Sequence, residues 1–285
     1  MQNVLEFEKP RTGINWKNVS IITSFHLLAI PALFTFSWPN LAALLIGNWI
    51  VGSLGVGLGW HRLLTHRGFK APKWLEYTLS LLATMSIQDS PDKWVATHRM
   101  HHAFTETDKD PHSTNRGFWW AQIGWIVWGT AQDHDAATLN KYVPDLIKDR
   151  GHALISRFYY VPIIVSAAIL FAIGGWTMVV WGVAARVVVG WHTTWFVNSL
   201  SHIFGSRPYD TGDLSTNNWF VALLTFGEGW HNNHHMSPTS ARHGLRWYQF
   251  DMNWIAICIL EKLGWATNIR VFDAEKPQLE LKQAA

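Results

Sequence analysis

The sequence predicts an all-α integral membrane protein in which four transmembrane helices form two hairpins, with a helical cap on the cytoplasmic side. Three observations support this prediction: apolar stretches that come in pairs, basic residues that lie on one side of them, and histidines grouped near their ends. The chain has 285 residues, of which 48% are hydrophobic and 15% charged, a composition that excludes a disordered or fibrous protein. Its 19 Trp residues, beside 6 Tyr, favour a membrane–water interface, where indole rings gather.

The four apolar stretches cover about residues 19–37, 41–59, 158–174 and 176–197. Each approaches the ~20 residues that a helix needs to cross ~30 Å of hydrocarbon. Very short turns join the members of each pair, Trp38-Pro39-Asn40 in the first and Gly174-Gly175 in the second. Each pair is therefore predicted to be a helical hairpin. Buried hairpins of a soluble core are the alternative, but uncharged pairs of this length are rare in such cores.

The basic residues predict the orientation. Of the 23 Lys and Arg residues, 3 precede the first span, 12 lie between the hairpins, 7 follow the last span, and Arg186 lies inside one. The positive-inside rule then places both termini and both large segments, 60–157 and 198–285, in the cytoplasm. We expect Arg186 to form a structural salt bridge or, second, a substrate contact.

Two further segments complete the predicted topology. The apolar segment Trp74–Ile87 is short and follows Lys73, so it is predicted to be an interfacial or capping helix rather than a fifth span. Met1–Lys17 contains acidic residues ahead of any apolar run and lacks the layout of a cleaved signal peptide, so the first span is expected to be retained. Residues 1–285 are predicted to form a single domain.

Nine of the fifteen histidines fall into four compact groups on the predicted cytoplasmic side. The groups are HRLLTH with His61 and His66, HRMHH with His98, His101 and His102, NSLSH with Asn198 and His202, and HNNHH with His231, His234 and His235. In a helix, positions i, i+3 and i+4 share a face, so each HxxHH group can direct at least two imidazoles at one point. Two such groups predict two metal ions in the cap.

The histidines leave the metal open among zinc, copper, iron and nickel. Eight or nine of them exceed the ligands of one zinc site and match two ions with four or five nitrogens each. Two redox metals beside a bundle that admits an apolar tail are suited to attacking an unactivated C–H bond with dioxygen. A metal transporter is the alternative from another class, but it should place its ligands along the spans.

From about Ile46 to Val271, the sequence resembles the integral-membrane fatty acid desaturases, through the boxes HRLLTH, HRMHH and HNNHH with NSLSH and GEGW before the last. The Δ9 branch, with its acyl-lipid and acyl-CoA forms, is the most similar. The resemblance implies two iron ions bound by the nine histidines, with Asn198 reaching one iron through water and no catalytic residue apart from the metal ligands. It also implies that O2 and two external electrons remove two hydrogens from an acyl chain, giving a cis double bond. A membrane hydroxylase of alkyl chains or sterols shares this histidine pattern and remains the alternative.

The resemblance also implies a substrate tunnel. Gln88, Trp94, Thr194 and Trp195 match the residues that line the kink of the acyl tunnel in acyl-CoA desaturases. The polar and basic positions expected near a CoA nucleotide differ, because Ala96-Thr97 precedes the second box and Asp89 follows Gln88. The segment SARHGLRWYQFD instead resembles the acyl-lipid branch. A glycerolipid-bound acyl chain is therefore favoured over acyl-CoA.

Carboxylates near the boxes could orient the ligating imidazoles through their second ring nitrogen. Among Glu106, Asp108, Asp110 and Glu228, we favour Asp110 and Glu228 for this role. Other histidines are given lesser roles: His112 and His243 are expected to be hydrogen-bond partners rather than ligands, and His134 and His152 to lie in solvated loops.

The partners follow from what the sequence lacks. It contains no haem motif, no flavin or nicotinamide fingerprint and no fused electron carrier, so electrons are expected from a ferredoxin, a b-type cytochrome or a rubredoxin at the basic cytoplasmic face. The single cysteine, Cys258, excludes a disulfide framework within the chain. No nucleic-acid partner is predicted. The sequence leaves open the acyl carrier, chain length, exact double-bond position, donor, oligomeric state and the assignment of each histidine to an iron.

Overall fold

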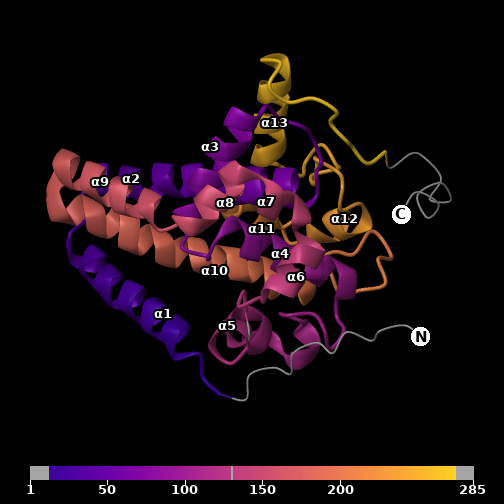
Figure 1. Ribbon diagram of the computed structural model, residues 1–285, viewed down its shortest axis with the longest axis horizontal. Helices are drawn as coiled ribbons and strands as arrows, with labels where there is room; N and C mark the ends of the chain where they lie inside the picture. Colours follow the sequence, from indigo (N-terminus) through magenta and orange to yellow (C-terminus); the bar gives the residue numbers. More distant parts are fainter. Residues whose placement is uncertain (1–12, 130, 274–285) are drawn as a thin grey trace.

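The computed structural model describes residues 13–129 and 131–273, so the two ends of the predicted domain lie outside the described residues. The described residues are helical, with three isolated β-bridges and no strand. Two parts are visible in Figure 1, a bundle of long helices and a group of shorter helices packed around one end of it, here called the head.

The bundle consists of helical rods (Figure 1). They are α1 (Trp16–Ala29) with η1 (Ile30–Phe34), α2 (Trp38–Asn48) with the π-helical η2 (Trp49–Thr65), α9 (Val161–Val179), and η5 (Val180–Ala185) with α10 (Arg186–Asn198) and η6 (Leu200–His202). Of these rods, α2, α9 and α10 run along the long axis of the molecule and α1 runs obliquely to them (Figure 1). In the described residues, three continuous helices are long and apolar enough to cross a membrane, Trp16–Phe34, Trp38–Thr65 and Val161–His202.

The third of these helices is interrupted where the sequence predicts a turn. Gly174 and Gly175 have non-helical backbone angles, with φ of −141° and +69°. The positive φ of Gly175 lies in the left-handed region that glycine enters without a steric penalty. The chain turns back on itself at this end of the bundle (Figure 1).

The first predicted turn is displaced by three residues. Trp38-Pro39-Asn40, predicted to be the turn, is instead the first turn of α2, and the chain leaves the helical path at Thr35–Ser37. Ser37 caps α2, because its hydroxyl accepts a hydrogen bond from the Asn40 backbone N–H at 3.2 Å. Proline is favourable in a first helical turn, where its missing N–H has no partner to lose.

The head contains the remaining helices. In its first half these are α3 (Lys73–Thr84), α4 (Pro91–Phe104), η3 (Thr114–Arg116), η4 (Trp120–Gly124), α5 (Trp125–Val127), α6 (Ala136–Tyr142), α7 (Pro144–Lys148) and α8 (Arg150–Arg157). In its second half they are α11 (Trp219–Leu224), α12 (His231–Met236) and α13 (Met252–Lys262).

Helix α3 packs against η2 through two glycines. A Cβ atom on Gly55 would stand 2.6 Å from the backbone nitrogen of Ala83, and one on Gly59 would stand 2.9 Å from the Cβ of Leu79. Because these two glycines have no side chain, the backbone of α3 can lie directly against the backbone of η2. Helix α3 occupies most of the segment predicted to be an interfacial or capping helix, and it is not among the candidate spans.

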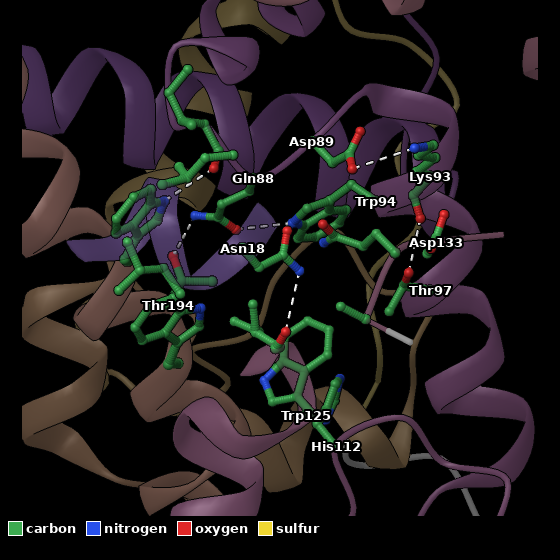
Figure 2. A pocket seen from close by; sticks show the side chains of 18 of the residues that line it. Asn18, Gln88, Asp89, Lys93, Trp94, Thr97, His112, Trp125, Asp133 and Thr194 are labelled. Carbon is green, nitrogen blue, oxygen red and sulfur yellow. Dashed lines mark hydrogen bonds and ion pairs between the residues drawn. The ribbon is translucent and has the colours of Figure 1, made fainter. Parts of the chain in front are cut away.

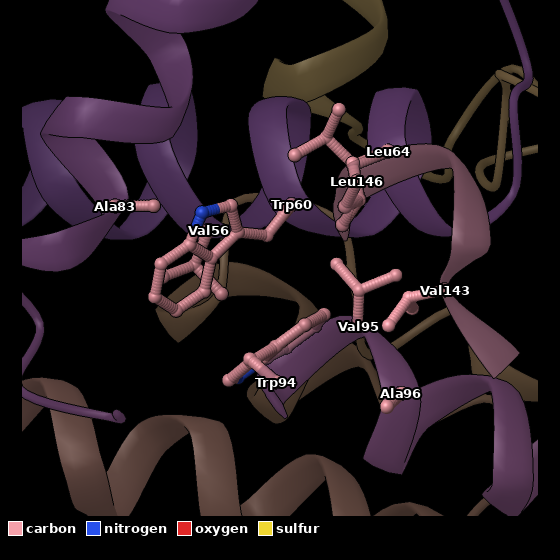
Figure 3. Close-up of a cluster of buried hydrophobic side chains, with 9 residues drawn as sticks. All are labelled: Val56, Trp60, Leu64, Ala83, Trp94, Val95, Ala96, Val143 and Leu146. Carbon is pink, nitrogen blue, oxygen red and sulfur yellow. The ribbon is translucent and has the colours of Figure 1, made fainter. Parts of the chain in front are cut away.

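An apolar cluster joins η2 to the second histidine box. Trp60 and Val56 of η2 lie against Trp94 and Val95 of α4, with Leu146 of α7 on the far side (Figure 3). Trp60 and Val95 are fully buried. The burial of these large side chains holds the first two histidine boxes at a fixed separation.

Two buried polar groups differ from expectation. Arg186 is buried, but instead of a salt bridge it donates hydrogen bonds to backbone carbonyls, Gly182 at 2.9 Å and Met85 at 2.8 Å. The Met85 carbonyl lies just beyond the last turn of α3, where carbonyls lack helical partners. The prediction of a solvated His152 is wrong: this ring is fully buried in α8 and is hydrogen-bonded to Glu76 at 2.8 Å.

Candidate active site

The nine predicted histidines lie together at the junction of the bundle and the head, in two adjoining groups. The first histidine group consists of His61, His66, His98, His102 and His234, and the second of His101, His202, His231 and His235. Within each group, the possible ligand atoms lie within 4.8 Å of one another. The groups adjoin, since the ring centroids of His102 and His235 are 4.7 Å apart.

Each HxxHH box contributes to both groups. In α4, His98 and His102 belong to the first group and His101 to the second. In α12 the division is reversed, because His231 and His235 belong to the second group and only His234 to the first. The i and i+4 positions lie one above the other on a helix, while the i+3 ring is rotated to one side, so one short helix serves two sites.

The first box uses a different geometry. His61 and His66 are five residues apart, a spacing that places two side chains on different faces of an α-helix. The chain is π-helical here, and the backbone N–H of His66 donates to the carbonyl of His61 at 3.1 Å. A π-turn joins residues i and i+5, so the two rings lie one turn apart and meet edge to face, with centroids 4.8 Å apart.

Carboxylates hold the outer nitrogens of four of the rings. The Nδ1 atoms of His61, His101, His202 and His235 lie 2.5, 3.0, 2.8 and 2.8 Å from Glu228, Asp110, Glu106 and Asp213, respectively. A carboxylate at Nδ1 keeps the proton there, so Nε2 presents its lone pair inward. The two favoured carboxylates, Asp110 and Glu228, are thus accompanied by two others.

The inner nitrogens are arranged to surround cations. The Nε2 atoms of His61 and His102 lie 3.2 and 3.0 Å from that of His234, and His231 Nε2 lies 3.0 Å from both His202 and His235 Nε2. This spacing suits neighbouring ligands about 2.1 Å from one cation. Buried Nε2 atoms of His66 and His101 have no hydrogen-bond partner within the described residues. Converging lone pairs and orphaned nitrogens fit a metal ion in each group.

Seven of the nine rings favour the neutral form that binds metal. Burial, and then repulsion from neighbouring rings, lowers the pKa of these seven well below the usual range: His66, His98, His101, His102, His231, His234 and His235. Burial alone would raise the pKa of the Glu228 carboxyl, but the charge of Arg62, together with His243 and His61, outweighs it and holds the pKa well below its ordinary value. Neutral imidazoles beside ionised carboxylates are the form required for metal binding.

Arginines next to two of the ligands fix the boxes from behind, a role that the sequence reasoning missed. Arg62 is fully buried and donates to both Glu228 and Asp251. Arg99 donates to Asp145 and to the carbonyls of Leu64 and Thr65, at the end of η2. The sequence does show that each arginine directly follows a histidine of a box, as His61-Arg62 in the first box and His98-Arg99 in the second. No residue pattern marked Asp213, which is distant from His235 along the chain.

Two cavities meet beside the first histidine group. The large cavity, of about 270 Å³, lies among α1, α4, α5 and α10, and the small one, of about 70 Å³, lies among α2, η2, α4, α10 and α11. Trp94, His98, Thr194 and Asn198 line both. A chain passing from one cavity to the other would therefore run along His98.

The four predicted tunnel residues all line the large cavity. Figure 2 shows Gln88 between Trp94 and Thr194. The Gln88 side-chain oxygen accepts a hydrogen bond from the Trp94 indole at 3.0 Å, and its amide donates to the Thr194 hydroxyl at 3.2 Å. Trp195 is buried against Trp191, with ring centroids 5.9 Å apart. The bridge joins α4 to α10 where the cavities meet.

The backbone around Gln88 is strained. Ile87 and Asp89 have positive φ angles of 52° and 70°, which cost on the order of 1–3 kcal/mol each for such residues. The indole of buried Trp191 donates to the carbonyls of Ser86 and Ile87, at 2.9 and 3.1 Å, and so holds this turn. Such strain is retained where a side chain must be held in one place.

An all-helical chain with apolar helices of spanning length and two buried histidine groups defines a class, membrane proteins able to bind two metal ions. Residues 36–261 match the family model described as fatty acid desaturase. The chain is 45% identical over 265 residues to an sn-1 stearoyl-lipid 9-desaturase of Anabaena variabilis, covering 92% of this chain and 96% of the relative. It is 43% identical to an sn-2 palmitoyl-lipid 9-desaturase of Nostoc sp. (strain 36), covering 90% of each chain.

Another relative is named as an acyl-CoA desaturase rather than a lipid desaturase. An acyl-CoA 5-desaturase of Anemone leveillei is 43% identical over 256 residues, covering 89% of this chain and 79% of the relative. The chain belongs to the fatty acid desaturase family. It is an oxidoreductase of lipid metabolism that introduces a double bond into an acyl chain.

Proposed function

We propose that the protein is an O2-dependent Δ9 desaturase that introduces a cis double bond into the acyl chain of a glycerolipid, in preference to acyl-CoA. The observation on which this rests is that two cavities share Trp94, His98, Thr194 and Asn198, so a chain that occupies both would pass the first histidine group at His98. The names of relatives add support, because the relatives from Anabaena variabilis and Nostoc sp. (strain 36) are lipid 9-desaturases.

The donor sets of the two histidine groups fit one iron ion each. Asn198, which lines both cavities beside His98, is proposed to act on one iron through water. Iron in both groups would supply the dioxygen chemistry that removes two hydrogens from an unactivated chain. The protein's own contribution is positional. The carboxylates at Nδ1 fix the ring orientations, and the buried Arg62 keeps Glu228 ionised so that it can hold His61.

The tunnel residues determine which carbons come to rest beside the metal groups. The Trp94–Gln88–Thr194 bridge lies at the junction of the two cavities, and the acyl chain is proposed to bend around it there. Buried indoles of Trp94 and Trp195 line the path and exclude water from it. A fixed bend at a fixed distance from the metal groups is a physical basis for one double-bond position.

The charges at the mouth of the large cavity favour the lipid carrier. Lys17 and Lys93 line the cavity together with Asp89 and Asp133, and Lys93 lies 3.4 Å from Asp89. Two basic and two acidic side chains leave the entrance of the cavity without a net positive charge. A polyanionic nucleotide gains most where several cations are available, each charge-assisted contact contributing roughly 1.5–3 kcal/mol.

The membrane arrangement proposed is four spans, because the Gly174–Gly175 interruption divides Val161–His202 into two helical segments that run back along each other. The positive-inside rule then places both termini, the head and the metal site in the cytoplasm. Electrons would come from a ferredoxin, or else a b-type cytochrome or a rubredoxin, at the basic face.

Expression in a host that lacks its own desaturase tests the assignment. Mass spectrometry of the host lipids should show new cis double bonds at carbon 9 of glycerolipid-bound chains, and a His101→Ala variant should give none. A hydroxylated chain instead of an alkene would contradict desaturation. Turnover of stearoyl-CoA with no turnover of lipid-bound chains by the purified protein would contradict the lipid preference.

A further inference from the structure

Helix α13 has one face of exposed apolar side chains. Ile255, Ile259 and Leu263 are 46, 54 and 53% exposed. They follow one another at intervals of four residues, so they form a single stripe along the helix. Three large aliphatic side chains in a stripe are costly in water, at about 25 cal/mol for each Å² left exposed.

The opposite face of α13 is attached to a candidate span. Asn253 is fully buried, its side-chain oxygen accepts a hydrogen bond from the Ser53 hydroxyl at 2.6 Å, and its amide donates to Glu228 at 2.6 Å. A Cβ atom on Gly57 would stand 2.3 Å from the Asn253 amide, so only glycine leaves room there. Ser53 and Gly57 belong to Trp38–Thr65, which is long and apolar enough to cross a membrane. These contacts set the depth of α13 along that helix.

The direction of α13 is the second observation. Figure 1 shows α13 standing across the long axis of the bundle, along which α2 and η2 run. A helix that crosses a spanning helix near the end of its apolar stretch lies close to the plane of the membrane. Trp74 and Trp265 beyond its last turn pack edge to face, with centroids 5.0 Å apart, and are 52 and 41% exposed. Tryptophan is the residue most typical of the membrane–water boundary.

We propose that α13 lies in the membrane–water boundary, with Ile255, Ile259 and Leu263 in contact with lipid. The occupant of this face is the bilayer that surrounds Trp38–Thr65. Successive residues of an α-helix are about 100° apart, so Lys262 and Cys258 lie beside the apolar stripe, and this edge faces water. This pattern of one apolar stripe and one polar edge is that of an interfacial helix.

The position of α13 affects the metal site because Asn253 binds the same carboxylate that holds His61. Lipid contact on the outer face and the Ser53–Asn253–Glu228 contacts on the inner face place the histidine groups at a constant height above the bilayer. This deepens the proposed function, since an acyl chain on a membrane lipid can reach the cavity only if that height is fixed. The lipid contact itself does not depend on turnover.

Nitroxide labelling tests the proposal without measuring activity. The chain has one cysteine, Cys258, so a label there reports on the polar edge. In a Cys258→Ala background, an Ile259→Cys variant places the label on the stripe, one residue away. Both proteins are reconstituted in vesicles of phosphatidylcholine and phosphatidylglycerol. Collision rates are measured with oxygen, which concentrates in lipid, and with a water-soluble nickel chelate.

We expect the label at position 259 to collide more often with oxygen and that at 258 more often with nickel. A label at Ile255→Cys should repeat the result for 259, which guards against a local folding defect in one variant. Nickel collisions as frequent at 259 and 255 as at 258 would show a water-exposed helix and overturn the proposal. Low collision rates with both reagents would show a protein contact and would also overturn it. A failure of desaturation in the host assay leaves these rates unaffected, so the two proposals fail separately.

Discussion

At the residue scale, the two nitrogens of an imidazole in the site have different partners. One contacts a carboxylate, and the other is left to bind a metal ion. Nδ1 is fixed by a carboxylate in His61, His101, His202 and His235, while Nε2 faces the centre of its group. The sequence identified the nine rings, because HxxHH spacing has a direct helical meaning. Of the four carboxylates that contact Nδ1, the sequence favoured Asp110 and Glu228, considered Glu106 and did not mark Asp213, because all four lie in loops and turns that no periodicity describes.

The Glu228 carboxylate gives a prediction for metal binding. Glu228→Gln removes the charge that holds His61 and leaves Arg62 with a weaker partner, so iron affinity should fall by about 10–100-fold. Iron content after dialysis against a graded series of chelator concentrations measures the change. Glu261→Gln, at an exposed position of α13, is the matched control and should retain iron like the wild type. Equal retention by the two variants would contradict the role given to Glu228.

The Gln88 bridge gives a prediction for product structure. Gln88→Leu keeps the volume but removes both hydrogen bonds, to Trp94 and to Thr194. The bend should then loosen, and double bonds should appear at more than one position. Product positions are determined by mass spectrometry of derivatised fatty acids. Ile22→Leu, a volume-conserving change in the same cavity, serves as the control; a single unchanged position in Gln88→Leu would refute the prediction.

Helical elements bring the boxes together through close contacts that hydropathy alone does not specify. The chain from Trp38 to Thr65 is one continuous helix, yet its second part is π-helical, and this is what aligns His61 with His66. The sequence predicted the apolar stretch but not the π-turn, because the two helix types have nearly the same local preferences. The displaced first turn has a similar cause, since Ser37 as a cap decides where α2 begins.

The contact between α3 and η2 is tested by a single added methyl group. Gly55→Ala would bring a Cβ atom to 2.6 Å from the Ala83 backbone, so the helices must separate. Overpacking of this kind typically costs about 1–3 kcal/mol in the free energy of unfolding. Thermal unfolding in detergent measures the loss. Gly190→Ala, where the nearest atom is the Asn48 side-chain oxygen at 3.6 Å, should be close to neutral; equal effects of the two changes would contradict the packing argument.

The whole molecule is organised around one junction, where η2, α4, η6 and α12 each contribute histidines to the two groups. These segments are far apart along the chain. Neutral rings crowded at hydrogen-bonding distance repel one another through their lone pairs until a cation is bound. The junction therefore depends on metal more than the apolar bundle does.

Iron removal should accordingly destabilise the head before the bundle. A ligand present at about 100 times its dissociation constant contributes ~2.7 kcal/mol to stability, so the chelated protein should melt about 5–10 °C lower. Limited proteolysis of that protein should cut first in residues 203–251, and iron repletion should restore resistance. Cleavage at the same rate with and without iron would show that the head is held by packing alone.

The sequence by itself determined the helical fold class and the nine metal-binding candidates through hydropathy and spacing, whereas the family and the four proposed tunnel residues came from the resemblance that its histidine motifs carry. Only the tertiary structure decided which histidine belongs to which group, which carboxylates hold them, how Arg62 and Arg99 fix the boxes from behind, and where α13 attaches. Spacing along a helix determines which side chains share a face. Which faces meet is determined by packing between distant segments, such as Gly57 against Asn253 and Trp60 against Trp94.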